Sequence, residues 1–88
     1  MFKRSLLINP RDNVAVVLEE ARQGDHIIVN EQNITLLNDT IFAHKVALQD
    51  FQAGDTILKY GEDIGFATRS ISKGEWIHTH NMGCKRGK

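Results

Sequence analysis

The sequence has one cysteine, one proline and no excess of charge of either sign. A single cysteine, Cys84, excludes an internal disulfide framework and favours a reducing cytoplasm as the location of the protein. The 11 Lys and Arg residues balance the 11 Asp and Glu residues, which gives no support to a nucleic-acid or membrane-surface role. No apolar run is longer than Val14–Leu18, which is far too short to span a bilayer, and the basic start lacks the apolar segment of a signal peptide.

The length of 88 residues predicts a single domain spanning 1–88, with residues 1–10 and 83–88 as flexible ends. A chain this short buries a modest core, so its stability margin is small. We therefore expect help from a partner subunit, which includes the possibility of a homo-oligomer.

One segment, "DNVAVVLEEARQG" at residues 12–24, has the spacing of an amphipathic helix. The apolar stripe consists of Val14, Val17, Leu18 and Ala21. Asp12 or Asn13 is a suitable N-cap, and Gly24 suits the left-handed residue that ends a helix. The sequence thus predicts one N-terminal helix.

The rest of the chain consists of short β-branched segments separated by glycines, which predicts strands. The segments are "HIIVN", "NITLL", "KVALQDF", "TILKYG", "GFATRSI" and "EWIHTHN", with "NEQN" as a hairpin turn. One helix and about six strands predict a mainly β, small α+β domain with antiparallel pairing. "QGDHIIV", "AGDTILK" and "KGEWIHT" share a glycine followed by an acid, which indicates either a duplicated unit or, as we prefer, one turn chemistry used three times.

The segment "WIHTHN" carries the densest chemistry in the sequence. On a strand, Trp76, His78 and His80 share one face, with the two imidazoles ~7 Å apart. Both rings can then converge on one metal ion or one anionic ligand. Two histidines fall short of the roughly three protein ligands of a catalytic metal site. The alternative is a pair of half-exposed histidines packed beside the tryptophan.

His44 stands at the start of a predicted strand and next to Lys45. Together with Lys59 and Arg69 it can form a cationic cluster suited to a carboxylate, sulfonate or phosphate group. The alternative is that these cations are solvated surface charges.

The loop "KYGEDIG" places Glu62 and Asp63 between two glycines. Paired acids on such a loop can serve as metal ligands or as a general base, although exposed turn acids are the more common case. The loop matches neither GxxxxGK[ST] nor GxGxxG, so it gives no phosphate-binding signature.

The order of these motifs resembles a family pattern. The segment "AHKVALQDFQAGDTILKYGEDIGFATRSISKGEWIHTHNM" is similar to G-H-K-[IV]-A-L, a G-[DE] turn, K-Y-G-E-x-I-G-x-A-T and G-E-x-[IV]-H-x-H-N, and the resemblance covers about residues 11 to 82. This pattern is typical of the N-terminal or small-subunit SAF-type domain of the altronate and galactarate dehydratases, and the small subunit of sulfolactate sulfo-lyase resembles it too. Ala43 departs from the pattern, which has glycine before the histidine.

The resemblance implies a β-clip fold and a role in a hydro-lyase that eliminates water from a polyhydroxy carboxylate. It also implies a divalent metal, Fe²⁺ or Mn²⁺, and a separate large catalytic subunit as partner. Carried onto this chain, it gives catalytic His44, His78 and His80; substrate-binding Lys45, Lys59, Tyr60 and Asn81; and His78 and His80 as metal ligands. The alternatives are a sulfolactate sulfo-lyase small subunit, a non-catalytic module that binds sugar acids, and a scaffold subunit.

Overall fold

The computed structural model describes residues 1–84, in which it has nine β-strands and no helix. The strands are β1 (Ser5–Leu6), β2 (Val14–Val17), β3 (His26–Val29), β4 (Gln32–Thr35), β5 (Lys45–Ala47), β6 (Thr56–Lys59), β7 (Glu62–Ala67), β8 (Trp76–Ile77) and β9 (Met82–Gly83). All strand pairs are antiparallel, so the predicted mainly β, antiparallel fold is confirmed. Within the same residues, no helix offers the length and apolarity needed to cross a membrane.

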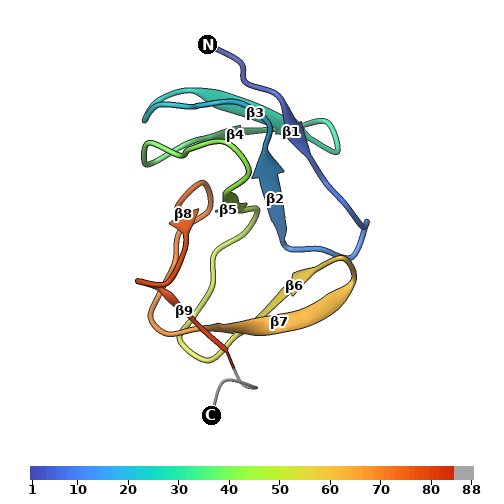
Figure 1. Ribbon diagram of the computed structural model, residues 1–88, viewed down its shortest axis with the longest axis vertical. Helices are drawn as coiled ribbons and strands as arrows, with labels where there is room; N and C mark the ends of the chain where they lie inside the picture. The colour runs from blue at the N-terminus through green and yellow to red at the C-terminus, as the bar shows by residue number, and fades with distance from the viewer. Residues whose placement is uncertain (85–88) are drawn as a thin grey trace.

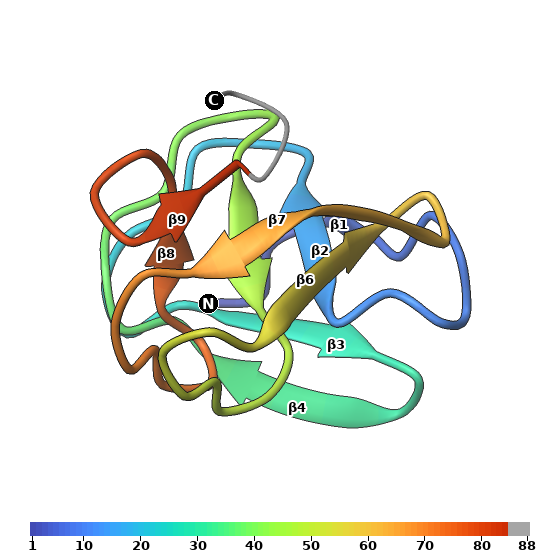
Figure 2. The same ribbon diagram turned by 90° about the horizontal axis from the view of Figure 1, so that it is seen from below.

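The strands form three small sheets. A central sheet has the order β1-β2-β5-β8, β3 and β4 form a hairpin, and β6, β7 and β9 form a third sheet. In Figure 1 the β3–β4 hairpin lies at one end of the long axis and β6 and β7 lie near the other, with β2 and β5 between them. Figure 2 shows the same arrangement from below. The central sheet thus joins the two ends of the molecule.

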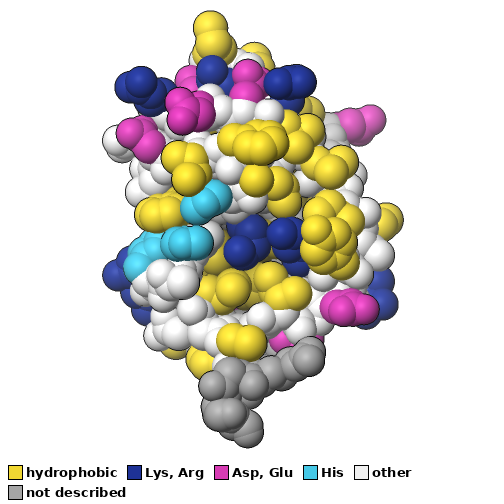
Figure 3. Space-filling model, in the orientation of Figure 1, with side chains coloured by type: hydrophobic (Ala, Val, Ile, Leu, Met, Phe, Trp, Pro, Cys, Tyr) yellow, Lys and Arg dark blue, Asp and Glu magenta, His cyan; other side chains and the backbone are white. Residues whose placement is uncertain are grey.

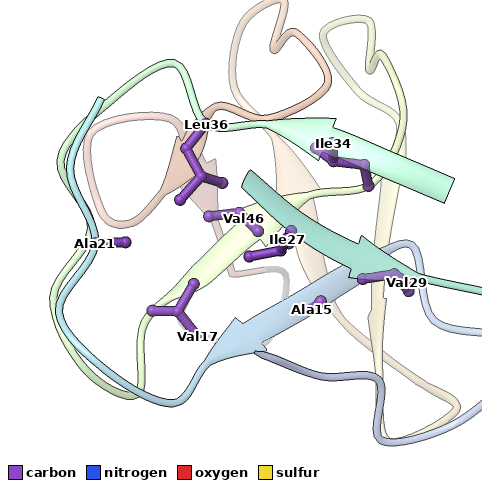
Figure 4. Close-up of a cluster of buried hydrophobic side chains, with 8 residues drawn as sticks. All are labelled: Ala15, Val17, Ala21, Ile27, Val29, Ile34, Leu36 and Val46. Atoms are coloured by element: carbon purple, nitrogen blue, oxygen red, sulfur yellow. The ribbon is translucent and has the colours of Figure 1, made fainter. Parts of the chain in front are cut away.

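Two clusters of buried apolar side chains hold these sheets together. The first consists of Ala15, Val17, Ala21, Ile27, Val29, Ile34, Leu36 and Val46, which Figure 4 shows close together. The second consists of Val14, Ala47, Phe51, Ile57, Ala67, Ile71 and Ile77. Successive side chains of a strand point to opposite faces, so Val46 and Ala47 of β5 enter different clusters. Strand β5, which begins at Lys45, is therefore anchored on both sides.

The predicted helix over residues 12–24 is wrong, because Val14–Val17 form strand β2. This strand is paired on both sides, with β1 and with β5, and all four of its residues are buried. A short continuous apolar run fits a fully buried strand as well as a helix, and its β-branched valines favour the strand. Gly24 does have a left-handed φ of 93°, but in the turn before β3.

All three glycine–acid segments form the same turn. Gly24, Gly54 and Gly74 have φ values of 93°, 96° and 91°. In each turn the acid accepts a backbone N–H bond at 2.9 Å from the residue three positions earlier; the pairs are Asp25 with Arg22, Asp55 with Gln52, and Glu75 with Ser72. The first two turns also begin equivalent hairpins, β3–β4 and β6–β7, while the third leads only into the short β8. The shared sequence pattern thus records a shared turn, and in two cases a shared hairpin.

The expected flexible ends lie partly within the described residues. In the stretch 1–10, Ser5 and Leu6 pair with β2, and Phe2 forms a bridge with His26. In the stretch 83–88, Gly83 belongs to β9, and residues 85–88 lie outside the described residues.

Candidate functional site

The histidine segment is a short strand followed by a turn. Strand β8 ends at Ile77, so His78 and His80 lie in the turn that leads to β9 and do not share a strand face with Trp76. Asn81 holds this turn from inside. It is fully buried, its side chain accepts a bond from the His78 N–H at 3.0 Å and donates one to the Trp76 carbonyl at 2.9 Å. The Asn81 amide therefore stabilises the turn, and both its oxygen and its nitrogen already have hydrogen-bond partners there.

Three histidines gather around one tryptophan. The Trp76 ring centroid lies 5.5 Å from that of His78, 4.8 Å from that of His80 and 5.9 Å from that of His44. His44 and His78 also stack on each other, with centroids 4.8 Å apart. The structure therefore brings all three predicted catalytic residues into a single cluster, which we call the histidine cluster (His44, Trp76, His78 and His80).

The tryptophan also makes a polar contact within this cluster. Its indole Nε1–H donates a hydrogen bond to Nδ1 of His44 at 3.0 Å. Strand pairing makes this contact possible, because Val46 of β5 lies opposite Trp76 of β8 and so places the segment before β5 beside the indole. Burial, followed by the nearby His78 and Lys45, lowers the pKa of His44 below its ordinary 6.5.

The predicted substrate-binding lysines lie next to the histidine cluster. Lys45 follows His44 directly and is half-buried, and burial together with the charge of Lys59 lowers its pKa from the ordinary 10.5. The ion pairs formed within residues 1–84 involve other residues, so neither lysine has a carboxylate partner there. Figure 3 shows histidine side chains beside lysine or arginine side chains near the middle of one face of the molecule. In the described part of the chain, Lys45 and Lys59 therefore make this surface cationic and are not paired with a carboxylate.

The turn that follows Lys59 and carries Tyr60 is fixed by a buried acid. Tyr60 and Gly61 form the two-residue turn between β6 and β7, with φ values of 61° and 72°. The Asp12 carboxylate, 8% exposed, accepts the backbone N–H groups of Tyr60 at 3.0 Å and Gly61 at 2.7 Å. Tyr60 is 60% exposed, and the Lys59 Nζ lies 5.1 Å from its ring centroid. Asp12, predicted as a helix cap, instead caps this turn.

The described residues do not by themselves fit a metal site. In residues 1–84 no group of three or more His, Cys, Asp or Glu side chains is arranged to hold a metal ion. Glu62 and Asp63, the other candidate ligands, are exposed at the start of β7, and Asp63 accepts the N–H of Gly65. The Nδ1 atom of His44 is occupied by Trp76. Any metal would need ligands from beyond this part of the chain.

A hollow in the surface lies away from these residues. It has a volume of about 410 Å³ and is lined by Phe2, Lys3, Arg4, Ser5, Leu18 and Ile28. It contains none of the residues predicted to act on a substrate, and its lining offers no histidine or carboxylate. We therefore place the candidate site at the histidine cluster and the two lysines.

The sequence pointed to each histidine but not to the contact that joins them. Trp76 and His44 are 32 residues apart, and Asp12 and Tyr60 are 48 apart. A local sequence pattern cannot predict hydrogen bonds between residues so far apart in the chain. The only sequence signal was the shared strand character of the two segments that bring them together.

The sequence is similar to those of known proteins. Residues 3–85 match the model of the altronate/galactarate dehydratase SAF domain. The chain is 40% identical over 74 residues to altronate dehydratase of Escherichia coli, covering 84% of this chain and 15% of that protein. It is 35% identical over 72 residues to galactarate dehydratase (L-threo-forming) of the same organism, covering 80% of this chain and 13% of that protein.

A third relative is similar in size. The chain is 37% identical over 82 residues to (2R)-sulfolactate sulfo-lyase subunit alpha of Chromohalobacter salexigens, covering 85% of this chain and 87% of that subunit. The chain thus spans less than a fifth of the dehydratases that it matches, and most of the sulfo-lyase subunit. On the extent of the match to the family model, this chain belongs to the family of altronate/galactarate dehydratase SAF domains.

Proposed function

We propose that this chain is the small subunit or N-terminal module of a sugar-acid hydro-lyase that eliminates water from a polyhydroxy carboxylate. It would act with a separate large catalytic subunit in the cytoplasm. The relatives supply the reaction class, since their names are those of dehydratases and of a sulfo-lyase subunit. The name of the sulfo-lyase relative supports the idea that such a domain works as one subunit of an assembly.

One observation carries the proposal. The histidine cluster stands beside Lys45 and Lys59, which have no carboxylate partner within residues 1–84. Lysine ammonium groups that no carboxylate of the described chain neutralises suit a ligand that carries oxygens and negative charge. A carboxylate with neighbouring hydroxyl groups has both.

The chemistry asked of the site is a β-elimination. A base removes the proton on the carbon next to the carboxylate, the hydroxyl on the following carbon leaves with a proton as water, and the resulting enol becomes a 2-oxo acid. Charge builds up on the carboxylate as the first proton leaves, and cations beside it stabilise that charge. Lys45 and Lys59 would hold the carboxylate, and His78 and His80 would deliver the proton to the leaving hydroxyl.

The test is replacement of His78 and His80 together by alanine in the enzyme assembled with its large subunit. We expect formation of the 2-oxo product from altronate or galactarate to fall by about 100-fold or more, because general acid catalysis contributes on that order. Thr79→Ala is the matched control, since Thr79 is exposed in the same turn. Full activity in the double variant would refute a catalytic role.

The exposed apolar residues beside the cluster support a covering partner. Ile41 and Phe42, 53% and 61% exposed, precede His44 by only a few residues. Large apolar side chains in such a position are typical of a surface that another chain covers. A stable complex with the large subunit, weakened by Phe42→Asp, is the expected result of a binding assay.

Two further candidates predict different experimental outcomes. A sulfo-lyase subunit, favoured by the match over 87% of subunit alpha, would release sulfite from sulfolactate. A non-catalytic module would bind galactarate in isothermal titration with the double variant as tightly as with the wild type. Fe²⁺ or Mn²⁺ stays a prediction for the assembled enzyme, tested by metal analysis of the purified complex.

A further inference from the structure

We propose that Trp76 holds His44 as the neutral Nε2–H tautomer, so that His44 acts as a hydrogen-bond donor to an oxygen of the ligand. In this role His44 is neither a general base nor a metal ligand, and Trp76 is its positioning residue. The nature of the ligand, a polyhydroxy carboxylate, rests on the proposed function. The tautomer itself does not.

The hydrogen bond between the two rings decides the tautomer. An indole Nε1–H only donates, so the His44 Nδ1 that it meets at 3.0 Å must carry a lone pair. A neutral imidazole has one N–H, which is then on Nε2. Protonation would place a second hydrogen on Nδ1, pointing at the indole N–H, and would break this bond.

Two neighbours, Trp76 and His78, fix the orientation of the imidazole. Stacking between Trp76 at 24° and His78 at 28° limits rotation of the imidazole plane. The Nε2–H direction is therefore set before a ligand arrives, which reduces the entropy lost on binding.

The Nε2–H is free to meet a ligand. Within residues 1–84 no side chain accepts a bond from it, and no buried side-chain nitrogen or oxygen lacks a partner, so this nitrogen reaches solvent. The adjacent cations of Lys45 and Lys59 are themselves donors, so none of the three groups satisfies another. An anionic oxygen of a ligand can accept hydrogen bonds from all three donors, the His44 Nε2–H and the two lysine ammonium groups.

The first experiment reads the tautomer in the full chain by long-range ¹H–¹⁵N correlation at a pH above 7. The inference requires a protonated Nε2 and an unprotonated Nδ1 in His44. Trp76→Phe keeps an aromatic ring and removes the donor, so we expect its His44 to move toward a mixture of tautomers. A wild-type His44 with its hydrogen on Nδ1, or a Trp76→Phe variant with an unchanged signal, would overturn the inference.

The second experiment separates a donor from a base or a metal ligand. In galactarate titrations of the assembled enzyme, His44→Gln keeps an N–H donor near the Nε2 position, whereas His44→Ala has none. We expect affinity to fall about 10-fold or more in His44→Ala and by only a few-fold in His44→Gln. Equal losses in both variants would rule out the donor role. If the wild-type enzyme binds neither galactarate nor altronate, the proposed function fails and the donor role with it, while the tautomer is judged by the first experiment alone.

Discussion

Replacing Ala43 by glycine should stabilise the chain. Ala43 has a φ of 74°, and its backbone N–H donates to the Val17 carbonyl at 2.8 Å. A left-handed conformation costs a residue with a Cβ about 1–2 kcal/mol, while the extra freedom of glycine in the unfolded chain costs about 0.5–1 kcal/mol. The Ala43 methyl group is exposed, so little packing is lost. The net expectation is a gain of about 0.5–1 kcal/mol in the free energy of unfolding.

For a domain of this size that gain corresponds to a rise in melting temperature of about 2–8 °C, measurable by circular dichroism. Ala53→Gly is the matched control, because Ala53 is exposed in a loop and is not among the residues with positive φ. Its stability should fall by about 0.4–1 kcal/mol. An Ala43→Gly variant as stable as the wild type or less so would show that the backbone strain argued here is absent.

Three further predictions follow from the fold. Gly24→Ala should cost about 0.5–1 kcal/mol, because the strain of a positive φ exceeds the entropy that alanine saves in the unfolded chain. Gly74→Ala should cost clearly more, because its Cβ would also clash with the main-chain oxygen of Thr35 in β4; equal losses of the two variants in urea denaturation would contradict this packing. Asp12→Ala should lower the free energy of unfolding by about 3 kcal/mol, because it leaves backbone N–H groups without an acceptor, while Glu62→Ala on the exposed end of β7 should change it little. Because the pKa of His44 is lowered from 6.5 in the folded chain, protonation of His44 opposes folding. The free energy of unfolding of the wild type, relative to that of His44→Gln, should therefore be lowest below the folded-state pKa, rise with pH, and level off above about 6.5. A relative stability that falls with rising pH would contradict the direction of this pKa shift.

The strands were predictable where the signal is local. In "HIIVN" and "TILKYG", β-branched and apolar residues follow a glycine turn directly, and Ile27 and Ile57 are fully buried in the resulting strands. The segment "VAVVLEEA" also fitted a helical stripe, and only its pairing with β1 and β5 resolves the ambiguity. Periodicity describes one segment at a time, whereas burial on both faces is a property of the whole sheet.

The candidate site was predictable as a set of residues and not as an arrangement. Same-face geometry on a strand was the argument for His78 and His80, yet β8 ends at Ile77 and a turn held by Asn81 brings the rings to Trp76. Polar residues such as Asn81 take their role from partners that the fold supplies. Their chemical type alone therefore does not separate contact with a ligand from support of a turn.

The paired hairpins show how a backbone can be kept while its outermost side chains change. The tips Asn30–Glu31 and Tyr60–Gly61 follow the same left-handed path, yet one tip presents an amide and an acid and the other a phenol ring beside a lysine. The path is dictated by main-chain geometry and, at the second tip, by a carboxylate beneath it. Side chains at such tips contribute little to folding, so they can be substituted during selection for a ligand while the backbone conformation stays the same.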